Sequence, residues 1–246
     1  MSEVLQKIIA ESGLMSRREA AKLIKGGGVK INGHLAKLGD RADNKQDVIL
    51  VRNQVLPINN PKIYLKINKP PGYTCTNRIF AKEKNIFELI KLPQRLFTIG
   101  RLDKHSQGLL IITNDGLLAQ RLTHPKFGHE KIYQVSIATN DGSISLEEKV
   151  AAKIISSLQQ GVNIGEGDGK VKVKKAKYLN KNFFELILNE GKKRQIRRMF
   201  KVLGFKIIHL ERTGFAGVDL KDLKLGAWEY LNEKEITIIR RRGRVG

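Results

Sequence analysis

A charged triplet lies at the entrance to an apolar run near the middle of the chain. Arg101 and Asp103 are separated by one leucine, and a polar loop follows them. The apolar run, 109–112, ends in a Thr-Asn-Asp-Gly turn. A short run of leucine and isoleucine between turn residues predicts a buried strand. A carboxylate this close to a core needs a partner or a chemical role. Asp103 is therefore a candidate catalytic carboxylate, and an aspartate that pairs with Arg101 or caps a turn is the alternative.

Two further segments carry side chains suited to nucleic-acid chemistry. The alternating segment 131–137 predicts a strand and holds Tyr133, whose ring could stack on a base or pack in the core. Five of the seven residues from 192 to 198 are basic. They follow Gly191, where we expect a helix to start, and a helix N-terminus with basic side chains favours phosphate.

These segments resemble the motifs of one enzyme family. Residues 100–116, GRLDKHSQGLLIITNDG, match every fixed position of the catalytic motif of the RsuA/RluB-type pseudouridine synthases, which modify ribosomal RNA. The Lys-x-Tyr-x-Val of 131–135 resembles their second motif, and EGKKRQIRRM at 190–199 resembles the third. Lys192 and Lys193 depart slightly from the usual pattern of the third motif.

The resemblance implies a set of catalytic residues. Asp103 is the implied catalytic aspartate, Tyr133 stacks on the target base, and Ile196 is the apolar residue beside the base. Arg197 is implied to pair with Asp103; a guanidinium can hold a carboxylate in two parallel bonds and keep it ionised. Arg101 is expected to fill the space that the flipped uridine vacates.

The implied reaction is the isomerisation of uridine. It breaks the bond from ribose C1′ to uracil N1 and joins C5 to C1′, so a carboxylate is the expected tool. No water is activated, so one carboxylate suffices. Asp103 either attacks C1′ or removes the C2′ proton, and the sequence leaves both open. We expect no cofactor and no metal, because the five histidines lack metal-ligand spacing and Cys75 is the only cysteine.

The N-terminal segment predicts a compact module that could present RNA to this site. Ser16 and Glu19 form the pattern of a capping box, followed by a helix from Arg17 to about Lys25. With a Val-Lys-Ile-Asn-Gly hairpin at 29–33, the module resembles the S4 RNA-binding domain. A solvated basic helix face is the alternative. The expected RNA-binding residues of the whole chain are Ser16, Arg17, Arg18, Lys22, Lys192, Lys193, Arg194 and Arg198.

The predicted fold class is α+β, in two domains. Residues 1–58 form the small S4 domain of helix, helix and strand, and 59–62, with proline and asparagine around them, form a linker. Residues 63–235 form the pseudouridine synthase catalytic domain, with a mixed, largely antiparallel β-sheet and an amphipathic helix around 85–91. Residues 236–246 form a basic tail, which we expect to be a disordered arm.

The chain carries a net charge of +22 with a pI of about 10.1, which favours a polyanionic partner. Residues 1–58 hold ten Lys and Arg against six Asp and Glu, so +4 lies there and +18 in the rest. RNA must therefore lie across both parts. There is no apolar run of about 18 residues and no secretory signal, so we expect a cytoplasmic protein without a membrane partner, and a monomer.

The predicted function is site-specific pseudouridine formation in ribosomal RNA, at a loop or bulge uridine where flipping costs least. Arg194 and the Arg-Thr-x-x-x-Gly of 212–217 resemble the large-subunit-type members of the family, and this resemblance favours 23S RNA as the substrate. A synthase acting on 16S RNA is one alternative. A non-catalytic S4-domain RNA-binding or ribosome-assembly protein is the other, although such a protein has no need of the whole catalytic set.

Overall fold

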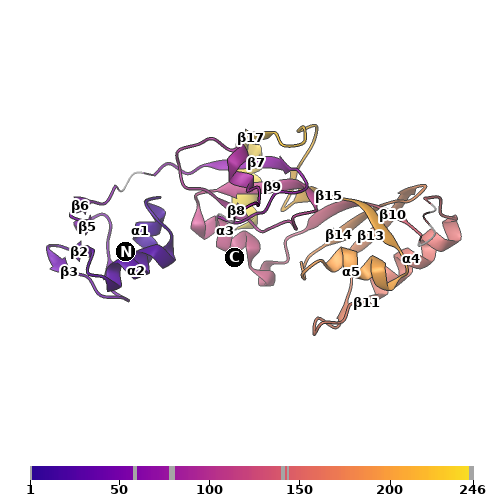
Figure 1. The fold of residues 1–246 in the computed structure, drawn as a ribbon, viewed down its shortest axis with the longest axis horizontal. Helices are drawn as coiled ribbons and strands as arrows, with labels where there is room; N and C mark the ends of the chain where they lie inside the picture. Colours follow the sequence, from indigo (N-terminus) through magenta and orange to yellow (C-terminus); the bar gives the residue numbers. More distant parts are fainter. Residues whose placement is uncertain (1, 58–59, 78–80, 140–141, 143, 244–246) are drawn as a thin grey trace. The chain divides into compact units, whose positions relative to one another are not determined.

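The structure is a computed structural model of the 246-residue chain (Figure 1). It describes residues 2–57, 60–77, 81–139, 142 and 144–243, so the expected linker, 59–62, lies partly outside the described residues. The chain divides into two compact units. The first comprises the residues up to Ile63 with Lys91–Phe97 and Thr113–Gly116, and the second comprises Tyr64–Ile90, Thr98–Ile112 and the residues from Leu117 onward. No helix within the described residues is long and apolar enough to cross a membrane.

The first unit combines two helices with small sheets around one core. The helices are α1 (Leu5–Glu11) and α2 (Arg17–Lys25). The four-stranded sheet has the order β3 (His34–Leu35), β2 (Val29–Ile31), β5 (Ile49–Val51) and β6 (Gln54–Val55), and β1 (Glu3–Val4) pairs separately with β4 (Arg41–Ala42). Apolar residues from both helices and from β2 and β5 form the core, among them Leu5, Ile9, Ala20, Ile24 and Val29.

The start of α2 confirms the capping box that the sequence predicts. The Ser16 hydroxyl accepts a hydrogen bond from the Glu19 backbone N–H at 3.2 Å, and the Ser16 N–H donates to the Glu19 carboxylate at 2.7 Å. Two orphan N–H groups of the first turn are thereby satisfied. The Asn32-Gly33 turn between β2 and β3 has positive φ at both residues, 49° and 84°, as a tight hairpin turn needs.

The second unit is built on a nine-stranded sheet. Its path is β13 (Lys175–Asn180), β14 (Phe183–Leu188), β10 (Lys131–Ala138), β15 (Lys206–Phe215), β9 (Gln107–Thr113), β7 (Tyr64–Lys69) and β17 (Trp228–Tyr230), with β16 (Val218–Asp219) beside β15 and β8 (Phe97–Ile99) beside β9. β13, β14, β10 and β15 pair antiparallel in turn, whereas β15 and β9 pair parallel. The α+β class with a mixed, largely antiparallel sheet is therefore confirmed.

Two helices cover one face of the sheet at β10, β14 and β15 (Figure 1). α4 (Glu148–Gln160) and α5 (Gln195–Val202) contribute to a core with β10, β14 and β15. The remaining elements are α3 (Gly116–Thr123), α6 (Glu233–Arg242), the 3-10 turns η1 (Ile86–Leu89) and η2 (Pro125–Phe127), and the short pair β11 (Val162–Asn163) and β12 (Lys170–Val171). Tyr133 packs against the α5 side of the sheet. The residues that alternate with it, Ile132 and Gln134, therefore face the other side.

The basic C-terminal segment is not a disordered arm. Residues 233–242 form α6, which begins at a capping box between Asn232 and Glu235 and buries Ile239 completely. Glu235 also accepts a hydrogen bond from Lys66 Nζ at 2.7 Å, and Lys66 is only 1% exposed. The arginines of the last turn are well placed, because cations stabilise a helix C-terminus. The arginines suggested disorder, but the capping box at Asn232 and Glu235 and the buried Ile239 stabilise a helix. Residues 244–246 lie outside the described residues.

Two other helix predictions need correction. The amphipathic helix expected around 85–91 is the single 3-10 turn η1, which Asn85 caps. The helix expected directly after Gly191 begins at Gln195, because Arg194 takes a left-handed backbone conformation, with φ of 52°. The basic residues 192–194 therefore lie on the turn that leads into α5, and not on the helix itself.

Candidate active site

The loop from Gly100 to Ser106, between β8 and β9, presents Asp103. The Ser106 N–H donates to the Asp103 carbonyl at 3.0 Å, which closes the loop on itself. Asp103 is half-buried, and among the described residues its carboxylate accepts no hydrogen bond and forms no ion pair. The carboxylate is therefore free to interact with a substrate.

Lys69, at the end of β7, holds this loop from beneath. Its ammonium is fully buried and donates to the carbonyls of Pro70 at 3.0 Å, Lys104 at 3.2 Å and Ser106 at 2.8 Å. Burial lowers the pKa of Lys69 from 10.5 to about 8, although the nearby Cys75 and Asp103 oppose the shift. Lys69 thus brings a positive charge close to Asp103 and fixes two carbonyls of its loop.

Further donors reach the loop from the segment after β7. The Gly72 N–H donates to the Lys104 carbonyl at 2.7 Å, and the Cys75 thiol lies 3.4 Å from the Leu102 carbonyl. Burial raises the pKa of this thiol. Cys75 is therefore a partly buried thiol that helps to seat the loop.

Arg197 reaches the loop from α5, but it does not pair with Asp103. The Nη2 of Arg197 donates to the His105 carbonyl at 3.0 Å and lies 3.4 Å from Ser106 Oγ. Arg197 and Asp103 form no ion pair within 4.0 Å. Its Nε is buried without a partner. Burial, and after it the charge of Arg194, lower the pKa of Arg197, while Asp103 acts in the opposite direction. The structure thus places the guanidinium near Asp103 and on its loop, without the direct pair that the resemblance implies.

Tyr133 and Arg212 are neighbours on β10 and β15. They are register partners, and both lie on the α5 face of the sheet. Tyr133 is half-buried. Arg212 is 2% exposed, donates from Nε to the Leu109 carbonyl at 2.8 Å and leaves Nη2 buried without a partner. Ile196 is 5% exposed and belongs to the core beneath Tyr133, so it packs under the site more than it opens onto it.

A glycine allows the two halves of the site to meet. Gly108 on β9 pairs parallel with Arg212 on β15, and its φ is +110°. A Cβ at Gly108 would lie 2.4 Å from the Arg212 carbonyl oxygen, closer than any real contact. Only glycine permits this backbone approach. It brings the strand that follows Asp103 against the strand that carries Arg212.

The basic residues expected to contact RNA fall into two groups. Arg101, Lys193 and Arg194 are exposed and form no ion pair with any described residue, and the exposed Lys192 Nζ lies 3.6 Å from Asp168 Oδ1. Arg198 differs, because its five N–H groups already donate to Asp168 and to the carbonyls of residues 164, 165 and 193. Arg198 therefore fastens the loop after β11, and its expected role in RNA binding stays a prediction.

On the first unit, Arg17, Arg18 and Lys22 are exposed on α2. Ser16 caps that helix, so its hydroxyl already has a structural role.

Sequence reasoning missed two residues of the site. Lys69 was not predicted to lie at the site, and Arg212 was considered only as part of the 212–217 segment that favours 23S RNA. Their signal is a long cation inside a strand pattern: every residue from Tyr64 to Lys69 is buried, and Arg212 lies within the ten-residue β15. A buried cation in a strand needs acceptors, and here they are the carbonyls around Asp103 and Leu109.

Comparison with known proteins agrees with this architecture. The family model described as RNA pseudouridylate synthase matches residues 63–201, and the S4 domain model matches residues 5–49. A crystal structure of a pseudouridylate synthase superposes with a TM-score of 0.67 at 30% identity, and the match covers 96% of this chain and 99% of that one.

Curated relatives extend over nearly the whole chain. Ribosomal large subunit pseudouridine synthase B of Buchnera aphidicola is 37% identical over 97% of each chain, and the enzyme of the same name from Bacillus subtilis is 34% identical over 97% of this chain and 96% of its own. The dual-specificity RNA pseudouridine synthase RluF of Escherichia coli K12 is 35% identical, over 94% of this chain and 76% of its own.

The fold and the carboxylate loop define an RNA-modifying isomerase with an attached RNA-binding domain. The chain belongs to the RNA pseudouridine synthases, in the RsuA/RluB/RluF family with an N-terminal S4 domain. It is therefore an enzyme, and the non-catalytic alternative is set aside.

Proposed function

We propose that this enzyme isomerises a uridine of large-subunit, 23S ribosomal RNA in the cytoplasm, with Asp103 as its catalytic carboxylate. The observation that carries the proposal is the Asp103 loop, whose carbonyls are held by Lys69, Gly72 and Arg197 while its carboxylate stays unpaired. The large-subunit substrate is supported by the relatives named for it, which match over almost their full length. A 16S substrate is the competing possibility.

The roles that we propose for the residues around Asp103 follow from where each side chain lies. Tyr133 lies half-buried on β10 and offers an aromatic face to the flipped base. Arg197 and Lys69 hold the loop and bring positive charge near Asp103. Arg101, exposed beside Asp103, is free to enter the stack that the uridine leaves. Lys193 and Arg194 offer unpaired cations to the RNA backbone, with Lys192 beside them.

Asp103 acts on the ribose in one of two ways, as nucleophile at C1′ or as the base that removes the C2′ proton. The N1–C1′ bond breaks, the base turns, C5 bonds to C1′, and the C5 proton is released while N1 gains one. Deuterium at C2′ separates the two, because only proton removal from C2′ gives a primary isotope effect on the single-turnover rate. A rate unaffected by this label assigns Asp103 as the nucleophile.

Tritium release from RNA labelled at uridine C5 tests the function. Purified enzyme should release tritium from 23S transcripts, and Asp103→Asn should lower the rate at least 10³-fold with RNA binding retained. Asp222→Asn, at an exposed aspartate of the same unit, is the matched control and should keep full activity. Release only from 16S transcripts would overturn the proposed substrate, and near-normal turnover by Asp103→Asn would overturn the role of Asp103.

A further inference from the structure

Two cations flank Tyr133 on the face of the sheet that α5 covers. Arg212 on β15 is the register partner of Tyr133, so the two Cβ atoms lie about 5 Å apart. Lys131 precedes Tyr133 by two residues on β10 and shares its face, about 7 Å along the strand. The two cations also share one aromatic ring, since Arg212 Cζ lies 5.2 Å and Lys131 Nζ lies 5.9 Å from the centroid of Phe215. Positive charge is therefore concentrated beside the tyrosine proposed to hold the base.

Arg212 carries a charge that the protein does not neutralise. The residue is 2% exposed, and within the described residues only its Nε–H, of five N–H groups, has an acceptor, the Leu109 carbonyl at 2.8 Å. Its guanidinium forms no ion pair within 4.0 Å with any described residue. A buried charge without a counter-ion is costly, so its presence here points to a functional role.

Lys131 is a second cation without a carboxylate partner. It is half-buried, and its Nζ donates to the carbonyls of His129 at 3.1 Å and Asn189 at 3.4 Å. In the described part of the chain it forms no ion pair within 4.0 Å. Burial, and after it the charge of Arg212, lower the pKa of Lys131, while Glu190 acts in the opposite direction. The two cations thus repel each other, and an anion beside them would be stabilised by both.

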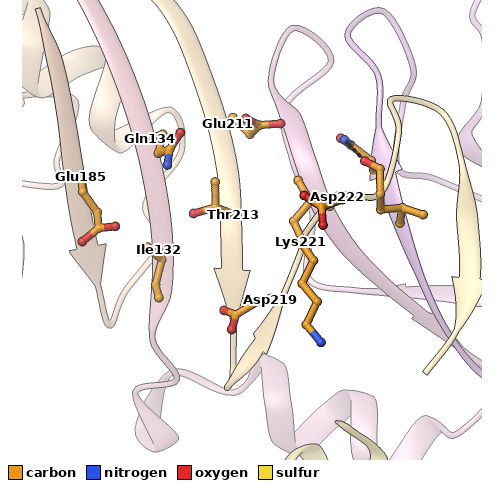
Figure 2. A pocket seen from close by; sticks show the side chains of 11 residues that line it. Ile132, Gln134, Glu185, Glu211, Thr213, Asp219, Lys221 and Asp222 are labelled. Carbon is orange, nitrogen blue, oxygen red and sulfur yellow. Dashed lines mark hydrogen bonds between the residues drawn. The ribbon is translucent and has the colours of Figure 1, made fainter. Parts of the chain in front are cut away.

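The acidic side chains of the same strands lie on the other face of the sheet. Glu185 on β14 and Glu211 on β15 line a cavity there, with Gln134 between them as the register partner of both (Figure 2). Gln134 alternates with Tyr133 along β10, so the sheet separates these carboxylates from the two cations. An anion that neutralises the cations must therefore come from the substrate side.

The proposed reaction produces such an anion. If Asp103 attacks C1′, its oxygen bonds to C1′ as the C1′–N1 bond breaks, and the electron pair stays on N1. If Asp103 removes the C2′ proton, a C1′–C2′ double bond forms and the same pair stays on N1. In both cases Asp103 becomes neutral and uracil carries the negative charge, spread over N1, O2 and O4. When C5 then bonds to C1′, the carboxylate leaves C1′ or returns the proton to C2′, and the charge is back on Asp103.

We propose that Arg212 and Lys131 stabilise the uracil anion while the base is detached. This inference rests on the roles proposed above for Asp103 and Tyr133. Arg212 acts through its charge from within the strand and needs no contact with the base. Lys131 is accessible, and its third N–H, unused within the described residues, is available to O2 or O4 of the base. Fixed positive charge placed where negative charge develops lowers the barrier most when water is excluded.

Lys131→Met tests the proposal, because Arg212→Met also removes the hydrogen bond to the Leu109 carbonyl and can unfold the strand pair. The single-turnover rate of tritium release at saturating enzyme should fall about 10- to 100-fold, with the dissociation constant for RNA unchanged. Lys131→Arg, which keeps the charge, should retain most of the rate. Lys153→Met removes an exposed lysine from α4 and is the control, which should match the wild type.

A change of leaving group separates charge stabilisation from a structural role of Lys131. The 4-thiouracil anion is more stable than the uracil anion, because sulfur accommodates negative charge better than oxygen, and 4-thiouridine keeps the C5 hydrogen that tritium replaces. The rate deficit of Lys131→Met should therefore be smaller, by about threefold or more, on RNA that carries 4-thiouridine.

Three outcomes would overturn the proposal: an equal rate deficit on both RNAs, a rate like that of the wild type, or a loss that appears only as weaker RNA binding. The wild type and Asp103→Asn are measured on the same RNAs. A failure of the proposed function would appear in those two proteins, and a failure of this inference only in the Lys131 variants.

Discussion

Asp103 owes its position to backbone carbonyls that other residues hold. Lys69 and Gly72 donate to the loop from the end of β7, and Arg197 donates from α5. The side chain of Asp103 is left for chemistry. A carboxylate that is oriented through its backbone needs no internal partner for a substrate to displace, which suits the catalytic role that we propose for Asp103.

The charge of Lys69 should control the pH range of activity. With a folded-state pKa of about 8, the side chain is an ammonium below that pH and a neutral amine above it. The amine keeps only two N–H groups for three carbonyl acceptors and loses its charge beside Asp103. We therefore expect the single-turnover rate to fall as pH rises through about 8. The measurement is the rate of tritium release between pH 6 and 10.

The stability of the protein should change in the opposite sense over this window. The unfolded chain has the ordinary lysine pKa of 10.5, so between pH 8 and 10.5 it binds more protons than the folded chain, and Lys69 makes unfolding less favourable as pH rises. Lys69→Arg, which stays charged, should lose both effects. If a folded Lys69→Arg protein keeps the fall in activity near pH 8, the titration belongs to another group.

For single residues, the sequence predicted the place in the secondary structure better than it predicted the hydrogen-bond partners. The capping pair Ser16–Glu19 was predicted correctly, because its partners lie three residues apart. The donors to the Asp103 loop could not be predicted from local pattern, because Lys69 and Arg197 reach it from distant segments. The hydrogen bonds of Arg198 could not be predicted for the same reason, since all but one of their acceptors lie in a loop 30 to 34 residues earlier.

Among the elements, the parallel pair β9 and β15 should be the least tolerant of change. Gly108→Ala places a methyl group 2.4 Å from the Arg212 carbonyl oxygen at a φ of +110°. We expect a loss of about 2–4 kcal/mol of unfolding free energy from steric overlap and backbone strain, with reduced turnover in the protein that remains folded. Urea denaturation and tritium release measure the two effects.

Gly226→Ala is the matched control for this substitution. Gly226 also has positive φ, +81°, but nothing lies within 4 Å of a Cβ built there. It should lose only the strain cost of about 1 kcal/mol. Similar losses in the two variants would show that the contact between β9 and β15 is not the reason for glycine at 108.

Elements defined by local signals agreed with the sequence prediction, and those that depend on distant contacts did not. α2, with its cap and apolar spacing, has the predicted bounds Arg17–Lys25. α6 was missed because its stability depends in part on Lys66, whose buried ammonium pairs with Glu235. In place of the helix expected around 85–91, the chain forms only the 3-10 turn η1. The apolar periodicity did not reveal that Asn85 caps this turn.

For the whole molecule, charge on the first unit should affect RNA affinity and leave chemistry unchanged. Arg17 and Arg18 are exposed on α2, and replacing both by alanine should weaken RNA binding and reduce the slope of log K against log salt by about 1–2. The single-turnover rate at saturating enzyme should stay as in the wild type. Filter binding at several salt concentrations and tritium release measure the two quantities.

Lys45→Ala removes an exposed cation from a loop of the same unit and controls for general loss of charge. Its salt slope should change less than that of the double variant. A double variant with normal affinity and a slow single-turnover rate would show that α2 acts on the reaction itself.

The pairing of β9 with β15 also has a consequence for how the chain acquires activity. Gln107 and Glu211, which lie side by side in these strands, are 104 positions apart, and β17 returns even later to pair with β7. Contacts of such long range slow folding, because the intervening chain must be closed into a loop first. During synthesis, the segment that carries Asp103 must wait for more than one hundred further residues before its neighbouring strand exists. Catalytic competence therefore arises only after β15 has been synthesised, and shorter nascent chains expose a buried strand, 109–112, that has no partner on that side.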